Sequence, residues 1–209
     1  IRYDAKGKLK EQFVELNLVT DWTNGIYSSA GYLPVNNEDY GGIFHKNINR
    51  WHFNMEANNL SKFITGGFYY EGGKFIVRFE DPTYVGFGHN LDIWATIKPF
   101  DRLRNDINYS YSELSKSAGG EKLFAGYVVS DKISYQFNKN FFLRVLLQYD
   151  LFSRNFTVDP LLSYKWNPYT ILFLGSSHDI SEISDNNGFG KYTETDRYFY
   201  LKFQYLWSL

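Results

Sequence analysis

The residues of this sequence that could act either as metal ligands or as catalytic bases are its four histidines, His45, His52, His89 and His178. No two of them show the i, i+4 spacing that pairs zinc ligands on one helix face. Strand geometry places Glu56 on the same face as His52, and Asp92 on the face opposite His89. The histidines therefore predict no metal site, and we expect no cofactor.

The run Ser177-His178-Asp179 contains the three residue types of a hydrolase triad. Adjacent residues of a strand point to opposite faces, so these three side chains cannot hydrogen-bond to one another as they stand. We therefore predict a non-enzymatic protein with no catalytic residues. A barrel-embedded hydrolase is kept as a third hypothesis.

Two runs rich in Asn and Asp, residues 36–39 and 185–188, could offer oxygen ligands to calcium. Neither has the spacing of the helix–loop–helix calcium site, and turns in exposed loops use the same residue types. The glycines at 66–67 and 86–88 lack the phosphate-loop pattern and favour strand ends or bulges. With no Cys, thiolate zinc sites, cysteine nucleophiles and disulfides are excluded.

The composition favours a membrane barrel. Aromatic residues make up 20% of the 209 residues, with 18 Tyr, 19 Phe and 5 Trp, which exceeds what a soluble core of this size needs. Transmembrane barrels place such rings in girdles at both membrane interfaces. No apolar stretch approaches the roughly 20 residues of a spanning helix. The net charge of −1, without a basic cluster, excludes nucleic acid as an expected partner.

The C-terminal segment shows a two-residue period over a membrane-spanning length. Its aromatic and aliphatic side chains alternate with Lys202 and Gln204, whereas a helical period would mix these polar residues into the apolar stripe. A similar alternation covers 141–150, 90–98 and 103–111. Weaker examples lie at 14–22, 51–57, 64–70, 123–136, 158–166 and 170–178. Together these segments predict about ten strands.

The connections alternate in length from Asn90 onwards. Tight turns are predicted at 99–101, 137–140 and 167–169, and longer loops at 113–121, 151–157 and 179–196. Towards the N-terminus the same order gives a turn at 58–60 and long loops at 72–89 and 23–47. Short periplasmic turns alternating with long external loops are typical of up-and-down outer-membrane barrels. We therefore predict an all-β, antiparallel up-and-down transmembrane β-barrel with Leu209 on the periplasmic side.

The alternation assigns each strand residue to one of two faces. The lipid-facing candidates are Phe199, Leu201, Phe203, Tyr205, Trp207, Phe141, Leu143, Val145 and Leu147. The lumen-lining candidates are Arg104, Asp106, Arg144, Gln148, Asp150, Lys165, Lys202 and Gln204. Such residues line a wet channel in a wide barrel and fill the interior of a narrow one.

Several runs in the C-terminal half form one pattern: Ser134–Asn138, Phe142-Leu143-Arg144, Gln148-Tyr149, Leu161–Tyr164, Asn167-Pro168, Phe173–Gly175, and the residues Phe199, Leu201, Lys202, Tyr205 and Leu206. With these runs, residues 90–209 resemble an uncharacterised family of bacterial outer-membrane proteins. Members of that family pair an N-terminal domain similar to family 9 carbohydrate-binding modules with a C-terminal barrel. The end of the chain also resembles the strand that barrels present to their assembly machinery, although Leu209 replaces the usual Phe or Trp.

These patterns predict one barrel domain over 1–209, clearest over 90–209, and either a processed chain or a fragment, because the sequence opens at Ile1 without Met. We expect an outer-membrane pore, anchor or subunit of an envelope assembly in a Gram-negative bacterium. Its partners would be outer-membrane lipid, other envelope proteins and glycans stacked on loop tyrosines at Tyr27, Tyr32, Tyr40 and Tyr84. The alternative is a soluble β-sandwich or lipocalin-like protein that binds a carbohydrate or another ligand.

Overall fold

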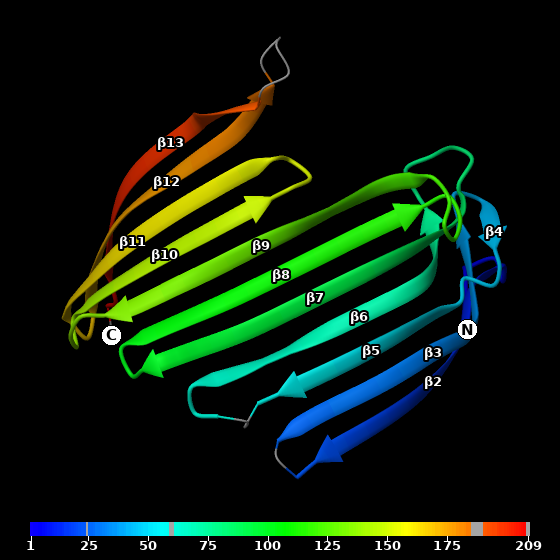
Figure 1. The fold of residues 1–209 in the computed structure, drawn as a ribbon, viewed down its shortest axis with the longest axis horizontal. Helices are drawn as coiled ribbons and strands as arrows, with labels where there is room; N and C mark the ends of the chain where they lie inside the picture. Colours follow the sequence, from blue (N-terminus) through cyan, green and yellow to red (C-terminus); the bar gives the residue numbers. More distant parts are fainter. Residues whose placement is uncertain (24, 59–60, 185–189, 208–209) are drawn as a thin grey trace. The chain divides into compact units, whose positions relative to one another are not determined.

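The computed structural model describes residues 1–23, 25–58, 61–184 and 190–207, and its regular structure consists of strands (Figure 1). In these residues no helix is long and apolar enough to cross a bilayer. The strands are β1 Arg2–Tyr3, β2 Leu9–Trp22, β3 Ile26–Tyr40, β4 Ile43–His45, β5 Arg50–Ala57, β6 Ile64–Val77, β7 Tyr84–Phe100, β8 Leu103–Ser115, β9 Lys122–Gln136, β10 Phe141–Asp150, β11 Asn155–Asn167, β12 Thr170–Ser184 and β13 Gly190–Tyr205.

All strands belong to one 13-stranded sheet in which neighbours in sequence are neighbours in space. The order runs from β1 to β13, except that β4 pairs with β3 alone, and β3 pairs next with β5. This order confirms the all-β, antiparallel up-and-down arrangement predicted from the connection lengths. Within the described residues the strand order has two ends, β1 and β13, and closure into a barrel stays a prediction.

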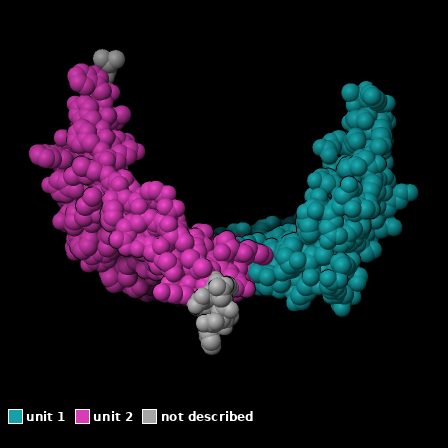
Figure 2. Space-filling view, turned by 90° about the horizontal axis from the view of Figure 1, so that it is seen from above, with its two compact units in different colours: residues 1–60, 66–93, 110–126 teal, residues 61–65, 94–109, 127–209 magenta. Residues whose placement is uncertain are grey.

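The chain divides into two compact units, which Figure 2 colours separately. Unit 1 comprises Ile1–Leu60, Gly66–Ile93 and Ser110–Gly126, and unit 2 comprises Ser61–Thr65, Trp94–Tyr109 and Tyr127–Leu209. Strands β7, β8 and β9 contribute residues to both. The prediction of a single domain over 1–209 is not tested by this division.

Unit 1 contains a small apolar core at the ends of its strands. The buried hydrophobic side chains of the described chain are Ile48, Ile76, Val77 and Leu114. Gly86 of β7 makes this packing possible, because a Cβ atom there would lie 2.5 Å from the carbonyl oxygen of Ser115. This core is too small to hold the large aromatic and aliphatic side chains of the sheet.

The predicted long loop at 23–47 is wrong. Residues 26–40 form β3, which follows β2 through a tight turn in which Gly25 has φ 71° and donates its N–H to the Trp22 carbonyl at 3.1 Å. The sequence pattern did not predict this strand, because small and polar residues such as Ser28, Ser29 and Gly31 interrupt the alternation of apolar side chains that indicates a strand.

Other predicted loops are shorter than expected for the same reason. β6 continues to Val77 and β7 begins at Tyr84, so the 72–89 loop shrinks to 78–83. The 179–196 loop is largely strand, since β12 reaches Ser184 and β13 begins at Gly190. The described residues form 13 strands where the sequence predicted about ten, and the strands not predicted are β1, β3 and β4.

The tight turns of unit 2 follow the predicted turn chemistry. The Asn138 side-chain oxygen accepts hydrogen bonds from the backbone N–H groups of Asn140 (2.9 Å) and Phe141 (3.1 Å). Asn167 holds the N–H of Tyr169 in the same way at 2.9 Å. Asn side chains stabilise turns through such bonds. The predicted turn at 58–60 includes Asn59 and Leu60, which lie outside the described residues.

Candidate functional site: the two faces of the sheet

Strand register places the predicted lumen-lining residues on one face of unit 2. Lys132 of β9 forms a 3.1 Å ion pair with Asp106 of β8, so these two side chains point to the same side. Lys132 lies directly opposite Leu146 of β10, and the registers of β10 to β13 extend the same face to the last strand. We call it the polar face. It carries all eight predicted residues: Arg104, Asp106, Arg144, Gln148, Asp150, Lys165, Lys202 and Gln204.

Asp106 is the centre of the densest charge cluster on this face. Its carboxylate accepts hydrogen bonds from Thr96 Oγ1 (2.7 Å) and from Arg104 Nε (2.8 Å), in addition to the ion pair with Lys132. Two cations against one carboxylate leave this cluster with a net positive charge. Beside it Arg104 and Arg144 line a shallow depression of about 300 Å³.

A second polar cluster on the same face was not predicted. Ser177 Oγ donates to Asp159 at 2.5 Å, and Thr157 Oγ1 donates to Asp179 at 2.6 Å. Asn155 also bonds Asp179 at 3.2 Å. Asn155, Thr157 and Asp159 alternate along β11 and so share a face, which the sequence could have indicated. Their partners Ser177 and Asp179 are identified only by the register of β11 with β12.

Asp150 also stabilises the connection that follows β10. It shares the polar face by register, but Oδ1 accepts the N–H of Phe152 at 2.8 Å, and Oδ2 accepts the hydroxyl of Ser153 at 2.8 Å. These bonds close the connection at 151–154, so Asp150 stabilises a loop at the rim.

The opposite face of unit 2, which we call the apolar face, carries the predicted lipid-facing strand residues. Cross-strand pairs link Phe141 to Tyr164, Tyr164 to Leu172 and Leu172 to Phe203. On β13, Phe199, Leu201 and Phe203 are 71%, 70% and 66% exposed. Trp207 lies just beyond the strand, with its ring 6.0 Å from that of Tyr205. Large side chains of β13 on this face are therefore mostly exposed, whereas Phe141, Leu143, Val145 and Leu147 of β10 are half-buried.

Unit 1 shows the same division. On its polar face Arg50 forms a 3.2 Å ion pair with Glu71, Ser112 donates to Asn90 at 2.8 Å and Ser110 donates to Asp92 at 2.5 Å. The polar face of unit 1 is thus also internally hydrogen-bonded.

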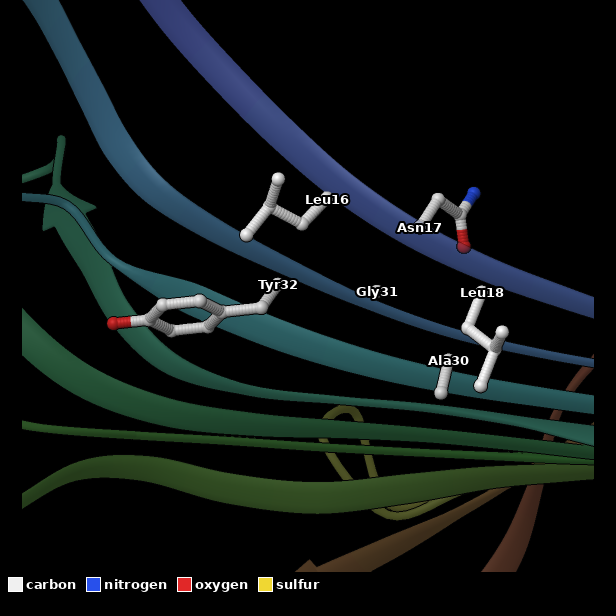
Figure 3. A pocket seen from close by; sticks show the side chains of 6 residues that line it. All are labelled: Leu16, Asn17, Leu18, Ala30, Gly31 and Tyr32. Atoms are coloured by element: carbon white, nitrogen blue, oxygen red, sulfur yellow. The ribbon is translucent and has the colours of Figure 1, made fainter.

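The apolar face of unit 1 includes a shallow depression between β2 and β3 (Figure 3). Leu16 lies opposite Tyr32 and Leu18 opposite Ala30, so these four side chains share one face. Leu16 and Leu18 are 60% and 68% exposed. The depression is open and apolar, and it presents no polar group arranged for catalysis.

The four tyrosines proposed to stack on glycans do not form one surface. Tyr27 and Tyr32 lie within β3 and point to opposite faces, since Tyr27 pairs with Glu56 and Tyr32 with Trp51. The guanidinium of Arg78 covers the Tyr40 ring at 4.4 Å. Their assignment to loops is therefore wrong, since Tyr40 is the last residue of β3 and Tyr84 is the first residue of β7.

In the candidate calcium site at 36–39, three side chains are bonded through their oxygen atoms to other groups of the protein. The side-chain oxygen of Asn37 accepts the N–H of Asn47 at 2.9 Å, Glu38 binds Arg78 at 2.9 Å, and Asp39 pairs with Lys8 and Lys10. Residues 185–188 lie outside the described part of the chain. Among the described residues no group of three or more His, Asp or Glu side chains could hold a metal ion.

Three of the histidines have partners that suit packing. His45 contacts Thr83 Oγ1 at 3.0 Å, and His89 contacts Tyr70 Oη at 2.6 Å. His52 lies 3.6 Å from Glu15 rather than bonding Glu56, and its ring covers Gly31, where a Cβ atom would lie 2.2 Å from the imidazole.

The fourth histidine, His178, has two hydrogen-bond partners that the sequence analysis missed. Ser177 and His178 point to opposite faces, as strand alternation predicts, and Asp179 faces Thr157. On the apolar face, however, His178 Nε2 lies 3.0 Å from Ser176 Oγ, and Nδ1 lies 2.8 Å from Glu194 Oε1. The i, i+2 spacing of Ser176 and His178 was a readable signal, but the position of Glu194 was not.

The loop between β8 and β9 carries its own ion pair. Lys116 Nζ lies 2.7 Å from the Glu121 carboxylate, and this hydrogen bond raises the pKa of Lys116 above its ordinary value. The backbone N–H of Lys116 also donates to the Glu121 carbonyl at 2.9 Å. The two ends of this loop are therefore held together at the rim.

Comparison with known proteins does not assign a family. No protein-family model matches the sequence, and no curated protein matches it. Among solved structures, the chain is similar to a NanC porin in a rhombohedral crystal form, with 13% identity, 92% of each chain covered and a TM-score of 0.36. A TM-score of this size does not establish a shared fold, so the function is argued from the chain's own residues. The resemblance to an outer-membrane family stays a prediction.

Proposed function

We propose that this chain forms a transmembrane β-barrel of a bacterial outer membrane, alone or as the C-terminal part of a larger barrel. In this proposal the polar face lines a water-filled lumen and the apolar face contacts lipid. The observation that carries the proposal is that the face opposite the polar residues exposes large apolar side chains on strands that have neighbours on both sides, such as Tyr164 of β11 (42%) and Leu174 of β12 (53%).

Strand length and burial support this proposal over a soluble protein. Strands β6 to β13 range from 10 residues in β10 to 17 in β7, and a tilted spanning strand needs about 9–11. A soluble β-sandwich would bury its apolar face against a second sheet, but every described strand belongs to one sheet. A contiguous uncovered apolar face of this size is unusual on a soluble monomer.

The polar face favours a pore over a purely structural wall. Its carboxylates Asp106, Asp159 and Asp179 are hydrogen-bonded to neighbours on the same face, so these carboxylates are stabilised without a plug from another segment. The Asp106 cluster keeps one cation in excess, and Arg144 adds another charge near it. Such a lining suits the passage of small polar solutes, with a preference for anions.

The proposal is tested by expressing the chain in a Gram-negative host and measuring its fractionation and its conductance. A folded barrel should cofractionate with outer membranes, migrate faster in gels when unheated than when boiled, and give step conductances in a planar bilayer. Recovery in the soluble fraction without a heat-dependent shift would contradict the barrel. Insertion without conductance would favour an anchor or an assembly subunit over a pore.

The sidedness of the barrel is tested by cysteine labelling at the two ends of β9. Ala118 lies in the 116–121 loop and Lys139 in the 137–140 turn, and both are exposed. A membrane-impermeant reagent added to intact cells should label Ala118→Cys and spare Lys139→Cys. The reverse result would invert the assignment of long loops to the outside.

A further inference from the structure

The strongest unexplained feature of the molecule is a polar cluster on the apolar face of β12 and β13. We call it the β12–β13 cluster, and it consists of Ser176, His178, Glu194 and Arg197. Its members meet across the strand pair, since His178 lies directly opposite Arg197. Ionisable residues that would face lipid are costly to the folded protein, so a cluster of them among exposed aromatic and aliphatic side chains is a candidate functional site.

The hydrogen bonds of His178 place its ring in the orientation of a catalytic base. A carboxylate can only accept, so the contact of Nδ1 with Glu194 Oε1 at 2.8 Å assigns the ring proton to Nδ1. Nε2 is then the acceptor for the Ser176 hydroxyl, 3.0 Å away. A serine, a histidine and an orienting carboxylate in this order are the constellation that activates a serine nucleophile.

A β-bulge makes this arrangement possible. Asp179 pairs with Asp196, but the next residue, Ile180, pairs with Glu194, so Thr195 is the extra residue of the bulge. A register shift of one residue moves every following side chain to the other face. Without the bulge, Glu194 would therefore point to the polar face, away from His178. Bulges that redirect a side chain are frequent next to active sites.

Glu194 is in turn fixed by Arg197. Arg197 Nε donates to Glu194 Oε1 at 2.6 Å, and a second guanidinium nitrogen contacts Oε2. The pair holds the carboxylate in one orientation, facing the His178 ring. Among the described residues, His178 is the one histidine with a hydroxyl at one ring nitrogen and a carboxylate at the other.

The surroundings of Ser176 indicate the substrate class. Ser176 is 8% exposed and lies opposite Phe199, whose ring contacts the His178 ring edge-on at 5.8 Å. Phe199 lies roughly 20 Å along β13 from Tyr205, at about 3.4 Å per residue. Beyond it on this face come Arg197 and Glu194. The serine thus lies where the apolar side chains of β13 give way to charged ones, which suits an ester that joins an acyl chain to a polar head group.

We propose that Ser176, His178 and Glu194 form a hydrolytic triad that cleaves carboxylic esters of acylated membrane lipids. The inference goes beyond the proposed pore and rests on it only for access from the bilayer. Ser176 Oγ bonds to the ester carbonyl carbon while its proton passes to His178 Nε2. Collapse of the tetrahedral intermediate breaks the bond to the alcohol oxygen, which leaves with that proton. Water then attacks the acyl-serine, gives a proton to Nε2 and releases the fatty acid as the proton returns to Oγ.

The experiment uses the purified full chain folded in detergent micelles, with the heat-dependent gel shift as the measure of folding. A fluorophosphonate probe should label Ser176 in the wild-type protein. The matched variant is Ser177→Ala, which removes the neighbouring hydroxyl from the polar face and should label like wild type. Ser176→Ala should lose labelling, and hydrolysis of a p-nitrophenyl ester should fall by roughly 10³-fold or more. Glu194→Gln, which keeps the side-chain shape, should lower hydrolysis by about 10²-fold or more.

The outcomes separate the triad from the barrel. A wild-type chain that shows the gel shift but is neither labelled nor hydrolytic overturns the triad and leaves the barrel standing. Labelling that persists in Ser176→Ala overturns it as well. Hydrolysis in detergent by a chain that never inserts into membranes supports the triad and contradicts the barrel. Phospholipid vesicles and purified lipid A serve as separate substrate arms, and fatty-acid release from either identifies the source of the ester.

Discussion

The two faces of unit 2 differ in the side chains that they carry and in the contacts that stabilise those side chains. On the polar face, Asp106, Asp159 and Asp179 each accept at least one hydrogen bond from a neighbouring strand. On the apolar face, Phe199, Leu201 and Phe203 of β13 are 66–71% exposed, and the β12–β13 cluster is the hydrogen-bonded polar group that we identified there. The polar face is therefore stabilised mainly by side-chain hydrogen bonds, whereas the large apolar side chains of the other face have few protein contacts. The same backbone supports both because strand side chains alternate.

The largest expected loss of folded protein comes from a charge introduced on the apolar face. Leu201→Arg should reduce the folded, heat-shifted fraction most, since an arginine at the bilayer midplane costs a barrel about 2–4 kcal/mol. Tyr205→Arg, nearer the interface, should cost less. Gln204→Arg lies on the polar face and is the matched control, with little expected loss. Equal losses in all three variants would remove the distinction between the two faces.

An intermediate effect comes from filling space on the polar face. A Cβ atom at Gly175 would lie 2.4 Å from the Tyr200 phenol, which crosses over this glycine. Gly175→Leu should therefore destabilise the folded chain by about 1–3 kcal/mol through overpacking. Urea unfolding from vesicles measures this loss. Combining it with Tyr200→Ala should restore most of the stability, and a double variant no better than the single one would rule out that contact.

A smaller effect concerns charge on the polar face, which lines the pore in the proposed function. Asp106→Asn removes the carboxylate between Arg104 and Lys132, and both cations should then favour anions in the pore. The reversal potential in a salt gradient should shift towards greater anion selectivity, with little change in folding. Thr96→Val removes a hydrogen bond to the same carboxylate without changing the charge, and it should leave the selectivity unaltered. An unshifted potential in Asp106→Asn would place Asp106 outside the conduction path.

The predictability of the fold differed between its two ends. The alternation from Phe199 to Tyr205 was enough to assign β13 and both of its faces, because large apolar and charged residues occupy successive positions. β3 was missed because Ser28, Ser29 and Gly31 carry little hydrophobic signal, although their neighbours on β2 and β5 fix them in strands. Local composition does not reveal a strand whose stability comes from its partners.

Prediction of the candidate sites was limited in the same way, because contacts between strands are not visible in local sequence. Alternation placed the eight lumen-lining candidates on one face, as the register does, and their place in a lumen stays a prediction. The bonds of Asp106 were not predictable, because they depend on which residues lie across the strand pair. The bulge at Thr195 is the clearest case, because the sequence alone gives Glu194 the wrong face relative to His178. Sequence spacing correctly separated Ser177 from His178, yet the contact with Glu194 required the register of β13.

The most direct test of the central claim is the solvent contacted by successive residues of β13. Spin labels placed singly at positions 198 to 205 in bilayers report collisions with oxygen, which is enriched in lipid, and with a water-soluble nickel chelate. The account predicts a two-residue period, with oxygen favoured at 199, 201, 203 and 205 and the chelate favoured at 198, 200, 202 and 204. Uniform contact with the chelate along the strand, or no alternation, would contradict a lipid-facing apolar face.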